Sequence, residues 1–238
     1  MDMPSRNFIN LDPEKRKAIL DAALDQFSKD SFKYMRVSEF IRQAHISRAS
    51  FYIYFEDKRD LYQAVLRRMY EEAGAVYMSC LREEKGCFYE ASCRAIQEFK
   101  AQEQWRDYVS VGREILEDRT CRRLAMEVGM EFHGTEYRRR FFTQCYGEMN
   151  RSRYPKLGEE YFAHAVDLAA GLLLRTLIVY ALDSPDMEEE GRAVRCQLMI
   201  VERALQNISG SEGYEAESKE PLFIGTANIS NQEGSKEE

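Results

Sequence analysis

The chain has 238 residues and a mass of 27.9 kDa, which allows one large domain or two small ones and excludes a mini-protein held together by disulfides alone. With 44% apolar and 32% charged residues, it is neither a low-hydrophobicity disordered polymer nor a membrane protein. The net charge of −7 is unevenly spread, because residues 1–70 carry a net +3 and the remainder a net −10, so the basic part of the chain is N-terminal.

Glycine and proline are scarce. The 13 glycines and 5 prolines are too few for the many short connections of a β-sandwich or a β-barrel. The composition therefore predicts an all-α protein.

The first eighty residues contain one helical segment of moderate length, then two short ones and a long one. Asp12-Pro13 is an N-cap followed by proline at the first helical position, and Ser47 and Asp57 are further capping residues. Apolar residues at helical spacing then predict helices at 13–29, 37–44, 48–54 and from about 58 to about 80.

The segments 37–44 and 48–54 have the spacing of a helix-turn-helix, in which the second helix enters the DNA major groove. The start of this second helix, Ser47 to Ser50, brings backbone amides, Arg48 and a hydroxyl close to phosphates and base edges. Lys58 is placed for a phosphate, and Tyr52 and Tyr54 present hydroxyls near the backbone. The spacing alone also fits a packed helical hairpin with an aromatic core and solvated charges.

The residues themselves add a family resemblance over residues 19–61. The string that carries it consists of Ala22-Ala23, Phe27, Val37, Ala44, Ile46-Ser47-Arg48, Ser50-Phe51-Tyr52, Tyr54-Phe55, Lys58 and Leu61. It resembles the TetR (tetracycline-repressor) family of bacterial transcriptional regulators, and the preceding Phe8 and Asn10-Leu11 look like a subgroup with a short leading segment. The resemblance implies a homodimer with a varied C-terminal ligand domain, which usually represses a promoter until a small molecule releases it.

Three residues depart from the family pattern. Arg36 stands where a capping Thr or Ser is usual, His45 replaces the turn glycine, and Ala49 replaces a glycine early in the recognition helix. His45 is therefore expected to adopt a left-handed backbone conformation. The predicted DNA-binding residues are Val37, Ser38, Ser47, Arg48, Ala49, Ser50, Tyr52, Ile53, Tyr54 and Lys58.

Beyond Gly86 the sequence predicts helices at 87–102, 106–118, 121–150, 158–182 and 187–208. The expected fold is thus all-α with about nine helices, comprising a three-helix helix-turn-helix DNA-binding domain and a larger helical ligand-binding and dimerisation domain. We place these domains at 1–60 and 61–208. Residues 209–238 are rich in Gly, Ser, Glu and Asn and are expected to form an acidic disordered tail.

Aromatic and methionine side chains are concentrated between residues 99 and 162. Such a stripe at helical spacing commonly packs a core, but so many amphipathic rings also suit a cavity for an apolar or aromatic ligand. His133 also fits a polar group whose hydrogen bonds are satisfied within the core. The candidate ligand-binding residues are Trp105, Tyr108, Met126, Met130, His133, Tyr137 and Phe141.

The expected partners are a pseudo-palindromic DNA operator, a small-molecule effector and a second copy of the chain, with no membrane. Dimerisation is expected through residues of about 158–208, where Leu172, Leu173, Leu177, Val179 and Leu182 cannot all face one core and Leu198, Ile200, Val201 and Leu205 offer a matching surface.

Enzymatic activity is not expected, because the sequence contains no phosphate loop, nucleophile elbow, His-Glu-x-x-His or paired Glu-x-x-His motif. No cofactor and no metal are expected. The six cysteines form no Cys-x-x-Cys pair, and the absence of an apolar signal core at the start predicts a cytoplasmic protein with structural thiols, a redox sensor being the alternative. The alternative function is a helical DNA-organising or interaction protein without ligand control.

Overall fold

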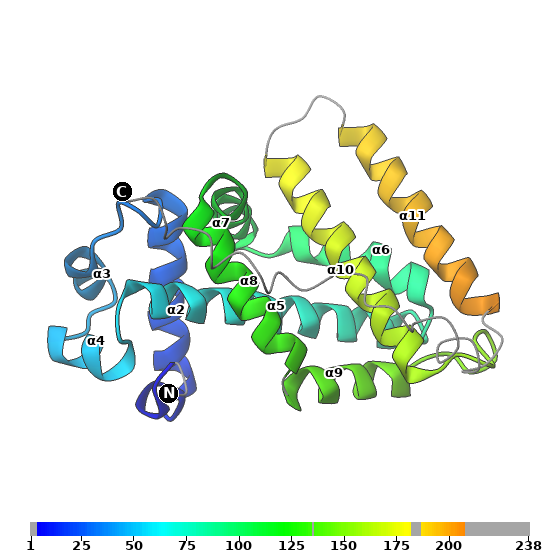
Figure 1. Ribbon diagram of the computed structural model, residues 1–238, viewed down its shortest axis with the longest axis horizontal. Coiled ribbons are helices and arrows are strands. Elements are labelled where there is room, and N and C mark those ends of the chain that lie inside the picture. The colour runs from blue at the N-terminus through cyan, green and yellow to red at the C-terminus, as the bar shows by residue number, and fades with distance from the viewer. Residues whose placement is uncertain (1–3, 135, 182–186, 208–238) are drawn as a thin grey trace, which may run out of the picture.

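The computed structural model describes residues 4–134, 136–181 and 187–207, which form eleven helices and no strand (Figure 1). Within these ranges, the side chains at 130–134, 137, 177, 178, 180, 181 and 187 are not described. The all-α prediction is confirmed. The expected tail, 209–238, lies outside the described residues. The helices are α1 (Arg6–Ile9), α2 (Pro13–Lys29), α3 (Val37–Gln43), α4 (Arg48–Tyr54), α5 (Lys58–Glu83), α6 (Phe88–Ala101), α7 (Trp105–Glu117), α8 (Arg119–Gly134), α9 (Glu136–Gly147), α10 (Glu159–Ala181) and α11 (Met187–Asn207).

The N-terminal helices begin where the capping residues predict. Oδ1 of Asp12 accepts hydrogen bonds from the amides of Glu14 and Lys15, at 3.0 and 3.2 Å. Oγ of Ser47 accepts one from the amide of Ser50 at 2.9 Å. These bonds satisfy amides that have no partner inside the helix, so the capping side chains fix the first residues of α2 and α4.

The helix arrangement differs from the expectation in two places. A four-residue helix, α1, precedes α2. The single helix expected at 121–150 is instead divided into α8, which ends at Gly134, and α9, which begins at Glu136. Figure 1 shows α9 running in a different direction from α8, and the two helices pack on different cores. A glycine at the end of α8 weakens the helix where that change of direction occurs.

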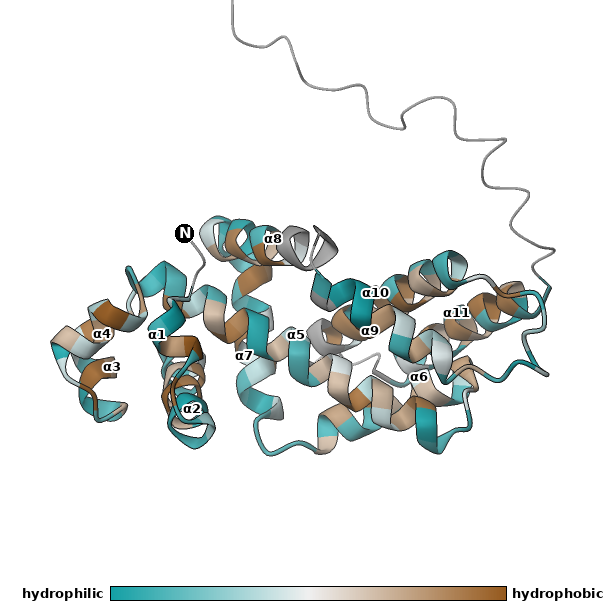
Figure 2. Ribbon diagram, turned by 90° about the horizontal axis from the view of Figure 1, so that it is seen from below, coloured by the Kyte–Doolittle hydropathy of each residue, from teal (hydrophilic) through white to brown (hydrophobic). Residues whose placement is uncertain are grey.

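The long helix α5 connects two hydrophobic cores. The first core joins α2, α3 and α4 to the N-terminal half of α5 and to α7 and α8. The second joins the C-terminal half of α5 to α6, α9, α10 and α11. Core packing is therefore continuous across residue 60, and the boundary between the two expected domains stays a prediction. Figures 1 and 2 show α3 and α4 at one end of the molecule and α11 at the other.

A polar network joins α2, α5 and α7 at the edge of the first core. The guanidinium of Arg68 on α5 lies 2.6 Å from Asp21 of α2, 2.6 Å from Glu72 and 3.0 Å from Oε1 of Gln104. Gln104 Nε2 donates to Asp21 at 2.7 Å, and the hydroxyl of Tyr108 donates to Glu72. Burial acts to raise the pKa of Asp21, but the hydrogen bonds from Lys17 and Arg68 outweigh it and leave this pKa lowered.

A second contact connects α7 to the loop between α2 and α3. The carboxylate of Glu114 accepts a hydrogen bond from the amide of Phe32, and Lys58 Nζ donates to the carbonyl of Phe32 at 2.9 Å. Burial raises the pKa of Glu114, and the bond from Phe32 offsets this only in part. Together the two polar contacts fix the helix-turn-helix end of the chain on α7.

The last two helices bury part of the surface that the sequence assigned to a dimer. Leu198 and Leu205 are 1% and 3% exposed and belong to the second core, so neither is available to a second copy. Ile200 is exposed, and so are Leu168 and Leu174 on α10. Leu177 and Leu182 lie outside the described side chains.

All six cysteines are free thiols. Burial raises the pKa of Cys121 and of Cys145 to about 12, which disfavours the reactive thiolate at both. These two thiols thus pack as apolar groups, whereas Cys196 is exposed on α11.

Candidate nucleic-acid interface

The turn between α3 and α4 orients the two helices. His45 has φ +52°, the left-handed conformation expected from its replacement of a glycine. The amide of Ile46 then donates to the carbonyl of Ile41 at 3.1 Å, which closes the end of α3. Phe40 and Phe51, both fully buried, meet with ring centroids 5.9 Å apart and hold α3 against α4.

The side of α4 opposite Phe51 faces outward. Ser47, Arg48 and Ala49 are exposed, and Tyr52 and Ile53 are each about half exposed. The guanidinium of Arg48 lies 5.7 Å from the centroid of the Tyr52 ring. The first two turns of α4 thus present a cation, an aromatic ring and the hydroxyl of Ser47 on one exposed surface.

Tyr54 and Lys58 are less exposed than the predicted DNA-binding residues 47–49 at the start of α4. Tyr54 is 9% exposed, and its ring packs with those of Phe8 and Phe55. The ring of Tyr54 therefore has a packing role, and a DNA contact by its hydroxyl stays a prediction. Lys58 Nζ donates to the carbonyls of Phe32 and Lys33, at 2.9 and 3.3 Å, so two of its three N–H bonds are used within the chain.

The start of α3 lacks a side-chain cap, as the arginine at position 36 predicts. Arg36 forms no capping hydrogen bond and instead pairs with Glu39 at 3.7 Å. Of the two residues predicted to touch DNA here, Ser38 is exposed and Val37 packs partly on the first core.

The loop before α3 carries exposed groups that the sequence reasoning did not select. Tyr34 is 69% exposed, and Nζ of Lys33 lies 5.3 Å from the centroid of its ring. Because Lys58 binds the carbonyl of Lys33, this loop adjoins the predicted phosphate-binding lysine. The adjacent basic and aromatic residues ahead of a short helix were the signal available in the sequence.

The four candidate ligand-binding residues whose side chains the structure describes lie in different surroundings. Trp105 and Tyr108 both contact Phe99, with ring centroids 6.1 and 5.5 Å away, and Tyr108 is buried in the first core. Phe141 packs on the second core, and Met126 is 61% exposed. The side chains of Met130, His133 and Tyr137 lie outside the part of the chain that the structure describes.

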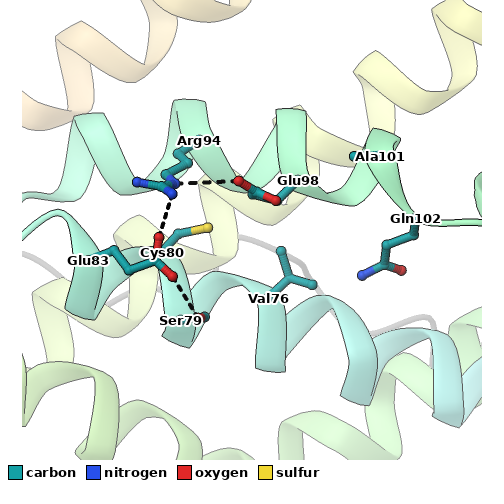
Figure 3. A pocket seen from close by; sticks show the side chains of 8 residues that line it. All are labelled: Val76, Ser79, Cys80, Glu83, Arg94, Glu98, Ala101 and Gln102. Carbon is teal, nitrogen blue, oxygen red and sulfur yellow. Dashed lines mark hydrogen bonds and ion pairs between the residues drawn. The ribbon is translucent and has the colours of Figure 1, made fainter.

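A groove of about 330 Å³ lies between α5 and α6 and contains none of these candidates (Figure 3). Arg94 on its rim pairs with Glu83, Glu84 and Glu98, at 2.5, 2.9 and 3.5 Å, so carboxylates outnumber the guanidinium. Figure 3 shows the thiol of Cys80 and the side chain of Val76 between the two helices. The groove is lined by Val76, Ser79, Cys80, Glu83, Arg94, Glu98, Ala101 and Gln102.

Neither a metal centre nor a membrane span is found in the described ranges. No three His, Cys, Asp or Glu side chains there are grouped to hold a metal ion. No described helix is both long and apolar enough to cross a bilayer.

Comparisons with known proteins converge on the N-terminal region. Residues 19–65 match the family model described as bacterial regulatory proteins, tetR family. The HTH-type transcriptional regulator RutR of Escherichia coli K12 is 44% identical over 55 residues, which are 23% of this chain and 26% of RutR. The uncharacterized HTH-type regulator YdgC of Bacillus subtilis is 31% identical over 70 residues, which are 29% of this chain and 36% of YdgC. The matched region thus spans about a quarter to a third of these relatives.

Solved structures extend the likeness of fold to most of the chain. The crystal structure of a putative TetR-family transcriptional regulator from Mesorhizobium loti has a TM-score of 0.52 at 15% identity, covering 80% of this chain and 96% of its own. NemR of E. coli in its reduced form has a TM-score of 0.52 at 16% identity, covering 79% and 96%. At these identities the likeness is one of fold, an N-terminal helix-turn-helix followed by a helical body.

Proposed function

Because the chain belongs to the TetR family of bacterial regulatory proteins, we propose that it is a sequence-specific DNA-binding transcriptional regulator. The observation that carries the proposal is the exposed surface of α4, where Arg48, Tyr52 and Ile53 project from a helix whose opposite side is buried. Side chains at the start of such a helix reach base edges when it lies in the major groove. Ser47 and Arg48 occupy that start.

The regulator acts as a homodimer. Leu168 and Leu174 on α10 and Ile200 on α11 are 60%, 44% and 68% exposed. Gly171 lies between the two leucines and has open space around it, so a second helix can approach closely there. A two-fold dimer of this kind presents two copies of α4, which suits a pseudo-palindromic operator with half-sites about one helical turn apart.

A small hydrophobic or aromatic effector releases the repressor from its operator. The groove between α5 and α6 supports this proposal, because α5 also carries Arg68, which contacts α2. A ligand that binds better when α5 has shifted would favour a state with a different α4 position. The excess of carboxylates at Arg94 favours an effector with a positive charge beside its apolar part.

Selection from random duplexes tests the DNA-binding proposal. The full chain should enrich a motif with two-fold symmetry, and its affinity for that motif should exceed its affinity for scrambled duplex by about 10³-fold or more. Enrichment of no motif would overturn sequence-specific regulation and favour a DNA-organising protein.

The effector proposal has a separate test with the selected duplex. A thermal-shift screen of apolar, aromatic and cationic compounds should yield a stabiliser that also quenches Trp105, the single tryptophan, three residues from Gln102 in the groove. That compound should weaken operator binding. A stabiliser that leaves operator affinity unchanged would contradict ligand control.

A further inference from the structure

The short helix α1 contacts the end of the recognition helix α4. The amide of Ser5 donates to the carbonyl of Tyr54 at 3.2 Å, and Oγ of Ser5 donates to the carbonyl of Ile53 at 2.7 Å. These carbonyls belong to the last turn of α4, where a helix leaves its acceptors without partners inside the helix. Ser5, which precedes Ile53 by 48 positions in the chain, therefore supplies both donors.

An aromatic contact holds α1 in this position. Phe8 is 2% exposed, and its ring centroid lies 4.7 Å from that of Phe55 and 5.9 Å from that of Tyr54. Arg16 on α2 donates to the carbonyl of Ile9 at 2.8 Å and ties the other end of α1 to α2. Ser5 and the helix α1 that follows it are thus held by contacts to α4, to the α4–α5 connection and to α2.

The recognition helix needs such support because it has only seven residues. Isolated helices of that length are marginal in water, and its C-terminal residue, Tyr54, is followed directly by the non-helical Phe55. Tyr52 and Ile53 lie in this last turn, and Tyr52 is the ring beside which Arg48 rests. If the last turn frays, the outward side chains lose their defined positions.

We propose that Ser5 and Phe8 are positioning residues for DNA recognition, which together form a clasp on the C-terminal end of α4. The effect on DNA binding rests on the proposed function, whereas the support that Ser5 and Phe8 give to α4 rests on the described contacts alone. The clasp fixes the geometry of the base-reading surface without touching DNA. It therefore contributes to sequence-specific affinity and leaves charge-driven, non-specific binding unchanged.

Hydrogen exchange of the DNA-free protein tests whether the clasp stabilises the last turn of α4. Ser5→Ala removes the hydroxyl bond, and exchange of the amides at 52–55 should accelerate by about 3- to 10-fold. Ser28→Ala is the matched control, because Oγ of Ser28 donates to the carbonyl of Asp25 within α2 at 2.8 Å. It should leave exchange at 52–55 unchanged. Equal exchange in Ser5→Ala and wild type would overturn the clasp whether or not the protein binds DNA.

Binding measurements test whether the clasp contributes to operator affinity. Ser5→Ala should lose about 3- to 10-fold of its affinity for the selected operator and none for scrambled duplex, and Ser5→Thr should restore the loss. Phe8→Leu, which keeps an apolar side chain, should resemble Ser5→Ala: exchange at 52–55 should accelerate and affinity for the operator should fall. Equal losses on operator and scrambled duplex would show a general folding defect and would contradict the positioning role. If the wild type selects no motif, the proposed function fails, and the exchange result alone decides the clasp.

Discussion

At the scale of single residues, exposure and hydrogen bonding separate the predicted DNA-binding side chains into groups with different roles. Arg48 is exposed beside Tyr52, whereas Lys58 holds two carbonyls of the loop before α3. We expect Arg48 to read a base and Lys58 to neutralise a phosphate with its remaining N–H bond. Removing a base contact lowers affinity for one sequence, whereas removing a phosphate contact lowers affinity for every duplex.

Arg48→Ala should therefore reduce affinity for the operator by about 1–3 kcal/mol and broaden the selected motif. Lys58→Ala should weaken all duplexes alike and reduce the slope of log affinity against log salt by about one. Fluorescence anisotropy across a salt series measures both effects. Lys156, an exposed lysine in the loop before α10, supplies the control, since Lys156→Ala should change neither quantity. An Arg48→Ala protein with unchanged motif and affinity would count against docking through α4.

Glu114 gives a pH-dependent prediction. Burial raises the pKa of this carboxyl, so folding favours its protonated form, and the stability it contributes is present at low pH and lost as pH rises through the folded-state value. Its neighbours Asp118, Cys121 and Lys58 also shift the pKa of Glu114, Asp118 upward and the other two downward. Glu114→Gln keeps an acceptor for the amide of Phe32 and removes the charge. Its Tm should exceed that of the wild type by about 2–4 °C at pH 8 and by less at pH 4.

Differential scanning calorimetry at the two pH values makes the comparison. Glu117→Gln, an exposed position on the same helix, should shift Tm little at either pH. A larger gain at pH 4 than at pH 8 would reverse the assigned sign and show that ionised Glu114 is stabilising.

At the scale of helices, α2, α5 and α7 are joined by charged side chains as well as by apolar packing. Arg68 is 11% exposed at its side chain and contacts carboxylates on two helices. Burial acts to lower the pKa of Arg68, but the hydrogen bonds that Arg68 donates to Glu72 and Asp21 outweigh it and raise this pKa. The network therefore fixes the angle between the helix-turn-helix and the body.

Arg68→Ala leaves Asp21 and Glu72 without their common partner, so it should cost about 2 kcal/mol of unfolding free energy. Chemical denaturation measures this cost. Lys17→Ala removes a solvent-exposed partner of the same Asp21 and should cost at most about 0.5 kcal/mol. Similar losses in the two variants would show that the network contributes no more than a surface ion pair.

At the scale of the whole molecule, the two ends of the long axis have different roles in the proposed regulator. The proposed DNA-reading surface is on α4 at one end, and α11 forms the other end, where it packs beside α10, the helix that carries the exposed leucines (Figure 1). The long helix α5 extends between them and contributes to both cores. A change in packing around α5 can therefore reach α4 through Arg68 and α2.

Dimerisation through α10 and α11 predicts a specific pattern of variants. Leu168→Glu combined with Leu174→Glu should convert the dimer to a monomer, because two charges would be buried at an apolar contact. Light scattering at micromolar concentration gives the mass. Leu116→Glu changes an exposed leucine on α7 and should leave the dimer intact. A wild-type protein that is monomeric under these conditions would refute the proposed assembly.

The sequence by itself determined the helical class, the starts of α2, α4 and α5, and the conformation of His45. Those features depend on a capping side chain or a backbone preference within a few residues, so local chemistry suffices to predict them. Only the tertiary structure separated the exposed Tyr52 from the buried Tyr54, divided α8 from α9, and placed Ser5 on the carbonyls of α4. Each of these depends on which distant helix packs against a given surface. That choice follows from the burial of apolar area over the whole chain, and a local pattern of residues does not contain it.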